Sequence, residues 1–336
     1  MKIQLLDYTI RASLSSKTDA RNVQEYADVA FGLAASGIEN VELGYLADEE
    51  NWLCRPMSGR IEDYYFLATN EGAEYSVMIH PTGYDIGKLP DCYGRIKRIR
   101  VLLRHDNKRD SLAYMREISS KGYKVICDIE GTYEYSDLEL IQLLKALSAF
   151  DIDQVTILDA TRLMDGRPVQ RAALLMDNNL SPEVKIGLRS GENNGMAQFV
   201  VNNFLGTPML GSRTVVVEGT LLGIGFISHN LCTECIADQL NEDFDGNYDY
   251  EHLIGLISIF IPGVNHDPGD VGAYHPIFYL TAKNQVDGDY GRYFLSKGVM
   301  LHEVDALLKQ VAKTERFEVF DEKVAENVYR KREAYI

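Results

Sequence analysis

The sequence contains no long apolar run. No stretch approaches the roughly eighteen uninterrupted apolar residues that a membrane-spanning helix needs, and the opening MKIQLLDYTIRA has the pattern of a β-strand. A secretion signal would instead start with a basic region followed by an apolar segment. We therefore expect a cytoplasmic protein that makes no membrane contact.

The sequence has fewer basic than acidic side chains. The 336 residues include 34 Lys and Arg against 50 Asp and Glu, which gives a formal net charge of -16 at pH 7. A surface of this sign repels phosphate backbones. We therefore expect no nucleic-acid partner. The net charge does not exclude small molecules or other proteins as partners.

Cysteine is scarce and odd in number. The five cysteines are Cys54, Cys92, Cys127, Cys232 and Cys235. Widely scattered cysteines in a chain of this length fit reduced thiols better than a disulfide framework.

One close pair of cysteines lies in HNLCTECIADQL, where His229, Cys232 and Cys235 recur every three residues. A helix would carry all three on one face, as three of the four ligands of a zinc site. Alternatively, the cysteines are small apolar residues on a buried helix face. The absence of a second cysteine or histidine pair nearby favours the second interpretation.

Eight short β-rich runs alternate with amphipathic segments of helix length. The runs are KIQLLDYTI, NVELGYL, EYSVMIH, RIKRIRVLLR, KVICDIE, QVTILDA, EVKIGL and TVVVEGTLLGIG. This alternation predicts parallel βαβ units, and eight units over about 240 residues match a TIM (β/α)8 barrel. A doubly wound sheet is the main competitor, but neither a P-loop nor a Rossmann glycine pattern follows the first strand.

The alternation stops near Asp238. Three later segments look helical, at 248–261, 301–312 and 321–335. We therefore predict a barrel over residues 1–237 and a helical C-terminal extension over residues 238–336 that shares the barrel's core. The segment HLIGLISIFI is more apolar than a surface helix needs, which predicts a homo-oligomer; alternatively, it covers its own barrel.

Charged residues gather at the predicted strand ends, where TIM barrels place their function. In the first strand, the period of two places Asp7, Thr9 and Arg11 on one face, toward the barrel interior or mouth. Arg11 is suited to bind a carboxylate or stabilise an enolate. Alternatively, it forms an internal ion pair with Asp7 or Glu42.

The segment LDYTIRAS resembles the opening D-x-T-L-R-D of the DRE-TIM metallolyases, which include 4-hydroxy-2-oxovalerate aldolase and 3-hydroxy-3-methylglutaryl-CoA lyase. The resemblance continues in order through VELGYL, RVLLRHD, GYKVICDIEGTYEYSDLEL, ILDATRLM, IGLRSGENNGMA, VEGTLLGIGFISHNLCTE and DGDYGRYFLSKG. It covers most of the chain and is nearest to the aldolase branch because of the segment around Tyr290. It implies a TIM barrel that cleaves or forms carbon–carbon bonds.

The resemblance also implies a metal site that this sequence does not keep. Such enzymes bind a divalent metal through an aspartate after the first-strand arginine, a His-x-His after strand seven and often an asparagine after strand eight. The matching positions are Ala12, Arg189 with Gly191, and Asn230. A methyl group and a hydrogen donate nothing to a metal, and a protonated guanidinium repels one. We therefore expect no metal cofactor at these positions.

These observations lead to one expected function and two alternatives. We expect an aldolase or lyase acting on a small 2-oxo or hydroxy acid, with Arg11 and Arg189 binding the anion, Tyr290 transferring a proton and Asn230 orienting an oxygen. Other residues expected to line the substrate are Asp7, Glu42, His105 and Asp159. The alternatives are a non-catalytic homologue that binds a small anion or a partner enzyme, and a Claisen-type acyl transferase. A metal site rebuilt from His80, His105, Asp128, Glu192 or His229 would match no known ligand spacing.

Overall fold

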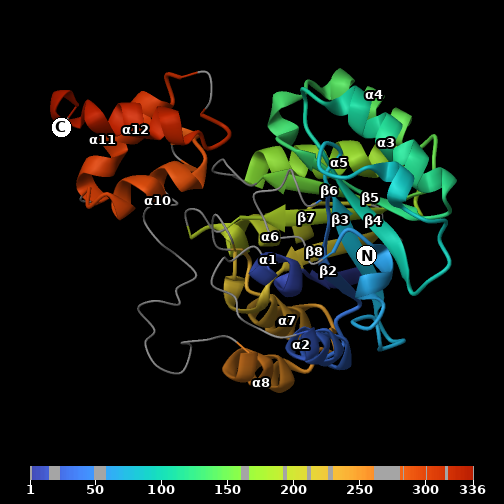
Figure 1. Ribbon diagram of the computed structural model, residues 1–336. Coiled ribbons are helices and arrows are strands. Elements are labelled where there is room, and N and C mark those ends of the chain that lie inside the picture. The colour runs from blue at the N-terminus through green and yellow to red at the C-terminus, as the bar shows by residue number, and fades with distance from the viewer. Residues whose placement is uncertain are drawn as a thin grey trace.

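The computed structural model describes residues 2–14, 23–48, 58–159, 166–191, 195–209, 213–225, 230–260, 281–282, 284–299, 301–314 and 317–335. Eight parallel strands close into a barrel in chain order, with β1 paired to both β2 and β8. Helices surround this barrel (Figure 1). The predicted TIM barrel is confirmed.

Each strand corresponds to one of the eight runs in the sequence. The strands are β1 Lys2–Asp7, β2 Asn40–Leu46, β3 Glu74–Ile79, β4 Ile96–Leu103, β5 Lys124–Glu130, β6 Ile152–Asp159, β7 Lys185–Ser190 and β8 Thr214–Gly219. The first strand is shorter than its run because the Asp7 carboxylate accepts the Thr9 backbone N–H at 2.8 Å. This bond turns the chain directly into helix α1.

Helices follow the strands and cover the outside of the barrel. They are α1 Thr9–Leu14, α2 Val23–Ala35, α3 Lys108–Ser120, α4 Asp137–Leu147, α5 Gly166–Asn179, α6 Ala197–Leu205, α7 Thr233–Asp243 and α8 Tyr250–Phe260, with short 3₁₀ turns at Ile61–Tyr64, Ile86–Lys88, Thr132–Glu134, Leu221–Gly223 and Arg332–Ala334. The start of α4 is fixed by a capping box, in which Ser136 and Glu139 bond each other's backbone N–H.

Alternate residues of each strand point outward and inward. The outward side chains, such as Val41 and Ile99, are fully buried against the helices in one large apolar core. The inward side chains are largely polar: Arg98 donates to Asn40 at 2.7 Å, and two residues further along both strands Arg100 meets Glu42. Charged groups therefore occupy the barrel interior toward its C-terminal end.

The C-terminal region divides differently from the prediction. Residues of α7 and α8 belong to the main core, whereas α10 Gly288–Ser296, α11 Leu301–Val311 and α12 Glu322–Arg330 enclose a second core. These three helices stand to one side of the barrel (Figure 1). The predicted boundary at 237/238 falls inside α7. Among the described residues, the buried apolar side chains of α10–α12 belong to the second core, which begins at Val286.

Helix α8 is the apolar segment from which self-association was predicted. Its residues Leu253, Leu256 and Ile257 are buried in the barrel's own core. Leu256 packs so tightly on α2 that a Cβ added at Gly32 would lie 2.6 Å from it. The three described leucine and isoleucine side chains of α8 therefore serve its own barrel, whereas Ile259, 75% exposed, and Tyr250, 37% exposed, face solvent.

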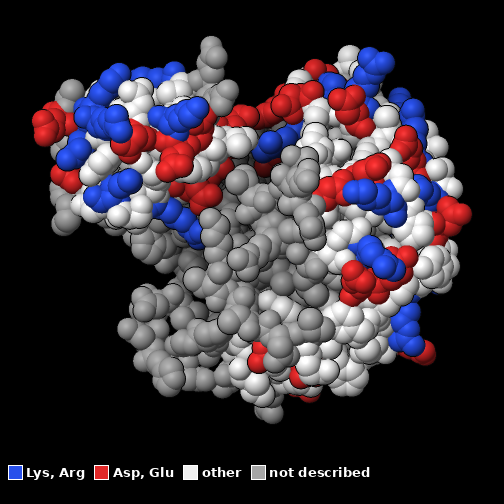
Figure 2. Space-filling view, viewed as in Figure 1, with Lys and Arg blue, Asp and Glu red and all other residues white. Residues whose placement is uncertain are grey.

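The surface carries charges of both signs. Figure 2 shows lysines and arginines interspersed with acidic residues over the C-terminal helices and the barrel on the face drawn. No helix of the described ranges combines the length and apolar character that crossing a bilayer demands.

Candidate active site at the C-terminal end of the barrel

Arg100 of β4 is the centre of a charged cluster inside the barrel. Its Nε donates to Glu42 of β2 and its Nη1 to Asp128 of β5. Nη1 and Nη2 both lie 3.1 Å from the Oε1 atom of Glu218 on β8. All four side chains are fully buried, so strands from several sides of the barrel are joined through one guanidinium group.

Two further arginines complete this cluster. The Nε atom of Arg189 lies 3.0 Å from Glu218, its Nη1 lies 3.1 Å from Asp128 and its Nη2 lies 3.8 Å from Glu42. The Nε atom of Arg11 pairs with Glu42. Three guanidinium groups thus face three carboxylates, and their formal charges cancel. We call these six residues the arginine cluster.

Neutral side chains of β6 support Glu218. Gln154 and Thr156 donate to its Oε1 atom at 2.8 and 3.0 Å. The neighbouring position on β7 is Gly187, where a Cβ would lie 2.6 Å from both of these side chains. The glycine in KIGLRS is therefore required by the polar packing below Arg189.

The three carboxyl groups of the arginine cluster differ in pKa, because burial and the arginines act on each to a different extent. Burial opposes the ionisation of Glu42, but the three surrounding guanidinium groups outweigh it and lower its pKa to about 2. Glu218 is likewise buried, and Arg100 with Arg189 lowers its pKa. Burial prevails at Asp128 and raises its pKa. Asp128 is therefore the member of the cluster that accepts a proton most readily.

Tyr8 lies between the two outer arginines. The guanidinium carbons of Arg11 and Arg189 both lie 4.6 Å from the centre of its ring. The side chain is 2% exposed, and within the described residues its hydroxyl has no hydrogen-bond partner. Burial raises the pKa of Tyr8, against the opposing effect of both arginines. A protonated phenol is thus held beside two cations.

The sequence pattern does not indicate Tyr8, because it predicts that the first strand continues to residue 11. A period of two through residue 11 places Asp7, Thr9 and Arg11 together and Tyr8 on the other face. The strand ends at Asp7, however, and α1 begins at Thr9. Arg11 therefore reaches the cluster from a helix, where its Nη1 donates to the hydroxyl of Tyr45 at 2.7 Å.

Asp7 does not join the arginine cluster. Its carboxylate accepts the Thr9 N–H at 2.8 Å and the Thr233 hydroxyl at 2.6 Å, which fastens β1 to the first residue of α7. The prediction that Asp7 lines the substrate is thereby corrected to a structural position. Burial outweighs these hydrogen bonds and raises the pKa of Asp7 to about 6.

This raised pKa predicts a stability gain for Asp7→Asn. A carboxyl whose pKa rises from 3.8 to about 6 on folding makes the folded state bind extra protons between these values, so stability falls as pH rises through this window. Asparagine keeps an oxygen acceptor and carries no charge. We expect the variant to gain up to about 3 kcal/mol at pH 7.5 and nothing at pH 4, measured by urea unfolding. An equal gain at both pH values would contradict this assignment.

The residues present do not fit the divalent metal that the sequence resemblance implies. Ala12 packs in a small apolar cluster with Tyr8, and Arg189 is ion-paired. Asn230 donates its side-chain N–H to the Ile224 carbonyl at 2.5 Å, and its backbone pairs with Gly191. Only Asn230 offers a donor atom, so these positions do not fit a divalent metal.

The structure places Tyr290 away from the arginine cluster. It is fully buried in the second core, its hydroxyl accepts the Asp321 N–H at 3.0 Å, and it donates to the Val319 carbonyl at 3.3 Å. The packing of α10–α12 thus fixes the position of Tyr290 inside the second core. The prediction that Tyr290 transfers a proton at the barrel end is corrected accordingly.

The remaining expected residues lie around the barrel end or outside the described side chains. His105 contacts the Tyr135 ring at 4.8 Å between centroids and lines a cavity of about 150 Å³ with Arg104, Glu130 and Glu318. Burial and Arg104 lower the pKa of His80. The side chain of Asp159 and all of Glu192 and His229 lie outside the described part of the structure.

No protein-family model and no curated protein matches the chain. Several solved structures share its fold. The N-terminal domain of a predicted aldolase from Bacteroides vulgatus is 16% identical, with a TM-score of 0.73 over 87% of this chain and 96% of that one. An HMG-CoA lyase from Bacillus subtilis is 17% identical, with a TM-score of 0.61 over 76% of this chain and 92% of that one. The carboxyl transferase domain of Rhizobium etli pyruvate carboxylase is 14% identical, with a TM-score of 0.70 over 99% of this chain and 60% of that one. At these identities the likeness is one of fold alone.

Proposed function

We propose that this chain is a carbon–carbon lyase of the aldolase type that acts on a small 2-oxo or hydroxy acid without a divalent metal at the barrel end. The observation that carries the proposal is the position of Tyr8, a buried phenol between Arg11 and Arg189. A proton donor beside two cations at the C-terminal end of a TIM barrel is what enolate chemistry requires.

Arg11 and Arg189 bind the substrate's anion in this proposal. Both keep 7% of their surface exposed, whereas Arg100 beneath them is fully buried. Within the described residues the buried Nη2 atom of Arg189 makes no hydrogen bond, and it lies 3.8 Å from Oε1 of Glu42. In this proposal a shift of the side chain presents this N–H group to a carboxylate or to the oxygen of an enolate.

Tyr8 transfers the proton. Cleavage of a 4-hydroxy-2-oxo acid breaks the bond between C3 and C4, leaves the electron pair on the enolate and requires the hydroxyl to lose its proton. The Tyr8 hydroxyl protonates the enolate carbon, and the resulting phenolate lies against two guanidinium groups that stabilise it. The hydroxyl proton of the same substrate leaves to solvent as the bond between C3 and C4 breaks. The phenolate then takes one proton back from solvent, so the phenol is restored and one proton has moved from the substrate's hydroxyl to the product carbon.

The second candidate is a non-catalytic barrel that binds a small anion or a partner enzyme. It is favoured by the internal pairing of the arginine cluster, in which Arg189 already faces Glu218 and Asp128. A cluster whose charges cancel holds the strand ends together without any ligand. The two candidates differ in whether an acid binds and is then cleaved.

An Arg189→Ala variant tests the proposed anion site. Because Arg100 still faces both carboxylates, we expect a loss of roughly 2–4 kcal/mol in the free energy of unfolding and a complete loss of ligand-dependent stabilisation. Millimolar oxaloacetate or 2-hydroxyglutarate should raise the melting temperature of the wild type, because a ligand that binds the folded state stabilises it by mass action. Thermal unfolding of both proteins with and without each acid measures the two effects.

The wild type incubated with a 4-hydroxy-2-oxo acid decides between the candidates. Carbonyl product released from a bound 4-hydroxy-2-oxo acid, at a rate unchanged by a chelator, supports the lyase. Binding without product supports the non-catalytic barrel. An Arg104→Ala variant is the matched control, because Arg104 pairs with Glu130 at the rim outside the cluster. A wild type whose melting temperature no acid changes would remove the anion site altogether.

A further inference from the structure

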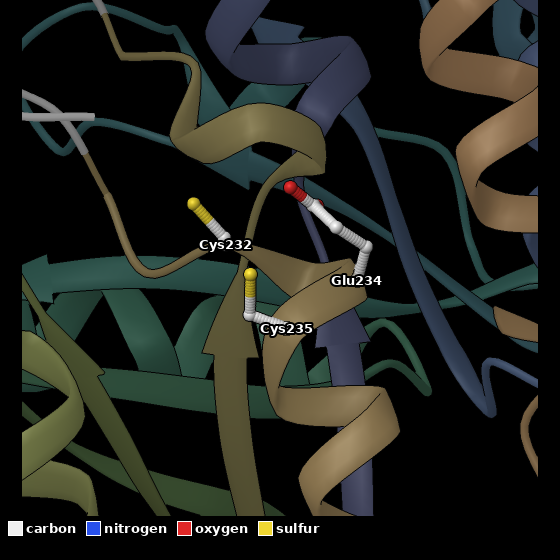
Figure 3. A group of neighbouring side chains, drawn as sticks. All are labelled: Cys232, Glu234 and Cys235. Atoms are coloured by element: carbon white, nitrogen blue, oxygen red, sulfur yellow. The ribbon is translucent and has the colours of Figure 1, made fainter. Parts of the chain in front are cut away.

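The first turn of α7 carries a second group of reactive side chains. Cys232 is the residue that precedes the helix, and Glu234 and Cys235 follow in its first turn. Their two sulfur atoms and a carboxylate oxygen all lie within 4.8 Å of one another. Figure 3 shows the three side chains near one another beside the start of the helix. Within the described residues, no other set of cysteine, histidine or acidic side chains converges in this way.

The group is walled on one side and open on the other. Glu234 is 5% exposed, and one of its oxygens, Oε2, accepts the Leu222 N–H at 3.0 Å. Cys232 is half-buried against the loop after β8, where a Cβ at Gly223 would lie 3.2 Å from its sulfur. Cys235 is exposed. The three donors therefore have fixed surroundings on the barrel side and solvent access on the other.

We propose that Cys232, Glu234 and Cys235 bind a thiophilic divalent cation of the Zn²⁺ type through two thiolates and one carboxylate oxygen. Two sulfur donors favour zinc over Mg²⁺ or Ca²⁺, which take oxygen ligands. Three protein ligands leave the fourth tetrahedral position to a water molecule. The site is separate from the metal position that the sequence resemblance implies, and it does not depend on the proposed lyase activity.

The spacing of the donors suits such an ion. Tetrahedral zinc with Zn–S bonds of about 2.3 Å places two sulfurs about 3.8 Å apart. The two sulfurs here lie within 4.8 Å of each other, so they need to close by at most about 1 Å. Binding the cation replaces the two thiol protons, which are released to solvent.

The cation would also have a structural effect. Glu234 already fastens the start of α7 to the turn at Leu222, and Cys232 bridges to Thr220 through its backbone. A metal ion shared by the two cysteines and this glutamate joins the helix more firmly to the end of β8. Addition of the metal should therefore raise the melting temperature of the protein.

Cobalt(II) titration of the reduced, metal-free full-length protein tests the proposal. We expect one Co²⁺ per chain, with a thiolate-to-cobalt charge-transfer band in the near ultraviolet and visible bands of tetrahedral cobalt. Added Zn²⁺ should remove these bands. Both C232S and C235S should lose the two-thiolate signal, and because Cys235 is exposed, C235S keeps the test decisive should C232S fail to fold.

Two further variants complete the design. E234Q keeps an oxygen that can accept from Leu222 but loses the anionic donor, so its charge-transfer band should persist while Co²⁺ binds at least about tenfold more weakly. C92S removes a cysteine from another part of the chain and should bind as the wild type does. Bands that survive in both C232S and C235S would overturn the proposal. So would a reduced protein that takes up no cobalt and merely forms a Cys232–Cys235 disulfide in air.

Discussion

An Arg100→Met variant will lose about 3–5 kcal/mol of its free energy of unfolding, because the substitution leaves buried carboxylates without their main partner. Arg100 is fully buried and bonds to Glu42, Asp128 and Glu218. After its removal, three carboxylates face the two remaining arginines of the cluster. Domains are usually stable by about 5–15 kcal/mol, so this loss takes a large share of the total.

Urea unfolding followed by circular dichroism measures this loss, and two variants make it specific. Arg104→Met removes an arginine whose side chain is 33% exposed and pairs with Glu130, and it should cost less than about 1 kcal/mol. Adding Glu218→Gln to Arg100→Met restores the charge balance and keeps an acceptor for Gln154, so part of the stability should return. Equal stability of the Arg100→Met and Arg104→Met variants would refute a central role for Arg100.

The position of the arginine cluster bears on its purpose. The interiors of TIM barrels are usually filled by layers of branched apolar side chains, and well-packed apolar residues are often at least as stabilising as buried ion pairs. Here, Arg98 in the lower interior donates to Asn40 and pairs with Glu74 and Asp153, and the arginine cluster follows nearer the strands' C-terminal ends. Stability alone gives no reason to bury the cluster, which is in line with the anion chemistry proposed above.

The barrel itself was predictable from the sequence because its signals are local. Runs rich in β-branched residues and spaced by amphipathic helices identify each strand, and a parallel barrel is the arrangement that buries all eight. The division between the two cores was not predictable in this way. The apolar faces of α7 and α8 resemble those of α10–α12, and the sequence pattern does not tell which core a helix joins.

The charged site was partly predictable for the same reason. Strand ends meet at one edge of a barrel, so Arg11, Glu42 and Arg189 were expected near one another, and the structure brings them together. Arg100 was overlooked because an arginine in the basic run RIKRIRVLLR is typical of a solvated strand face. Its burial depends on acidic partners from three other strands, which no local pattern in β4 reveals.

Tyr8→Phe should lower the rate of carbon–carbon cleavage by roughly 10²–10⁴, the usual contribution of a positioned acid or base. Phenylalanine keeps the ring between Arg11 and Arg189 and removes only the hydroxyl. Affinity for a small acid should therefore change little, so the loss appears in kcat and leaves binding intact. Stability should stay equal or rise by about 1 kcal/mol, since a buried hydroxyl without a partner is costly.

A matched control separates the proton transfer from the mere removal of a buried hydroxyl. Tyr123 is also fully buried, and within the described residues its hydroxyl likewise has no hydrogen-bond partner, but it precedes β5 at the opposite end of the barrel. Tyr123→Phe should thus match Tyr8→Phe in stability while leaving turnover and acid binding as in the wild type. If Tyr8→Phe turns over as fast as Tyr123→Phe, the phenol between the two arginines is not the proton donor. Loss of turnover in Tyr8→Phe alone, with the acid-induced rise in melting temperature preserved, would assign the proton to Tyr8 and the anion to the arginines beside it.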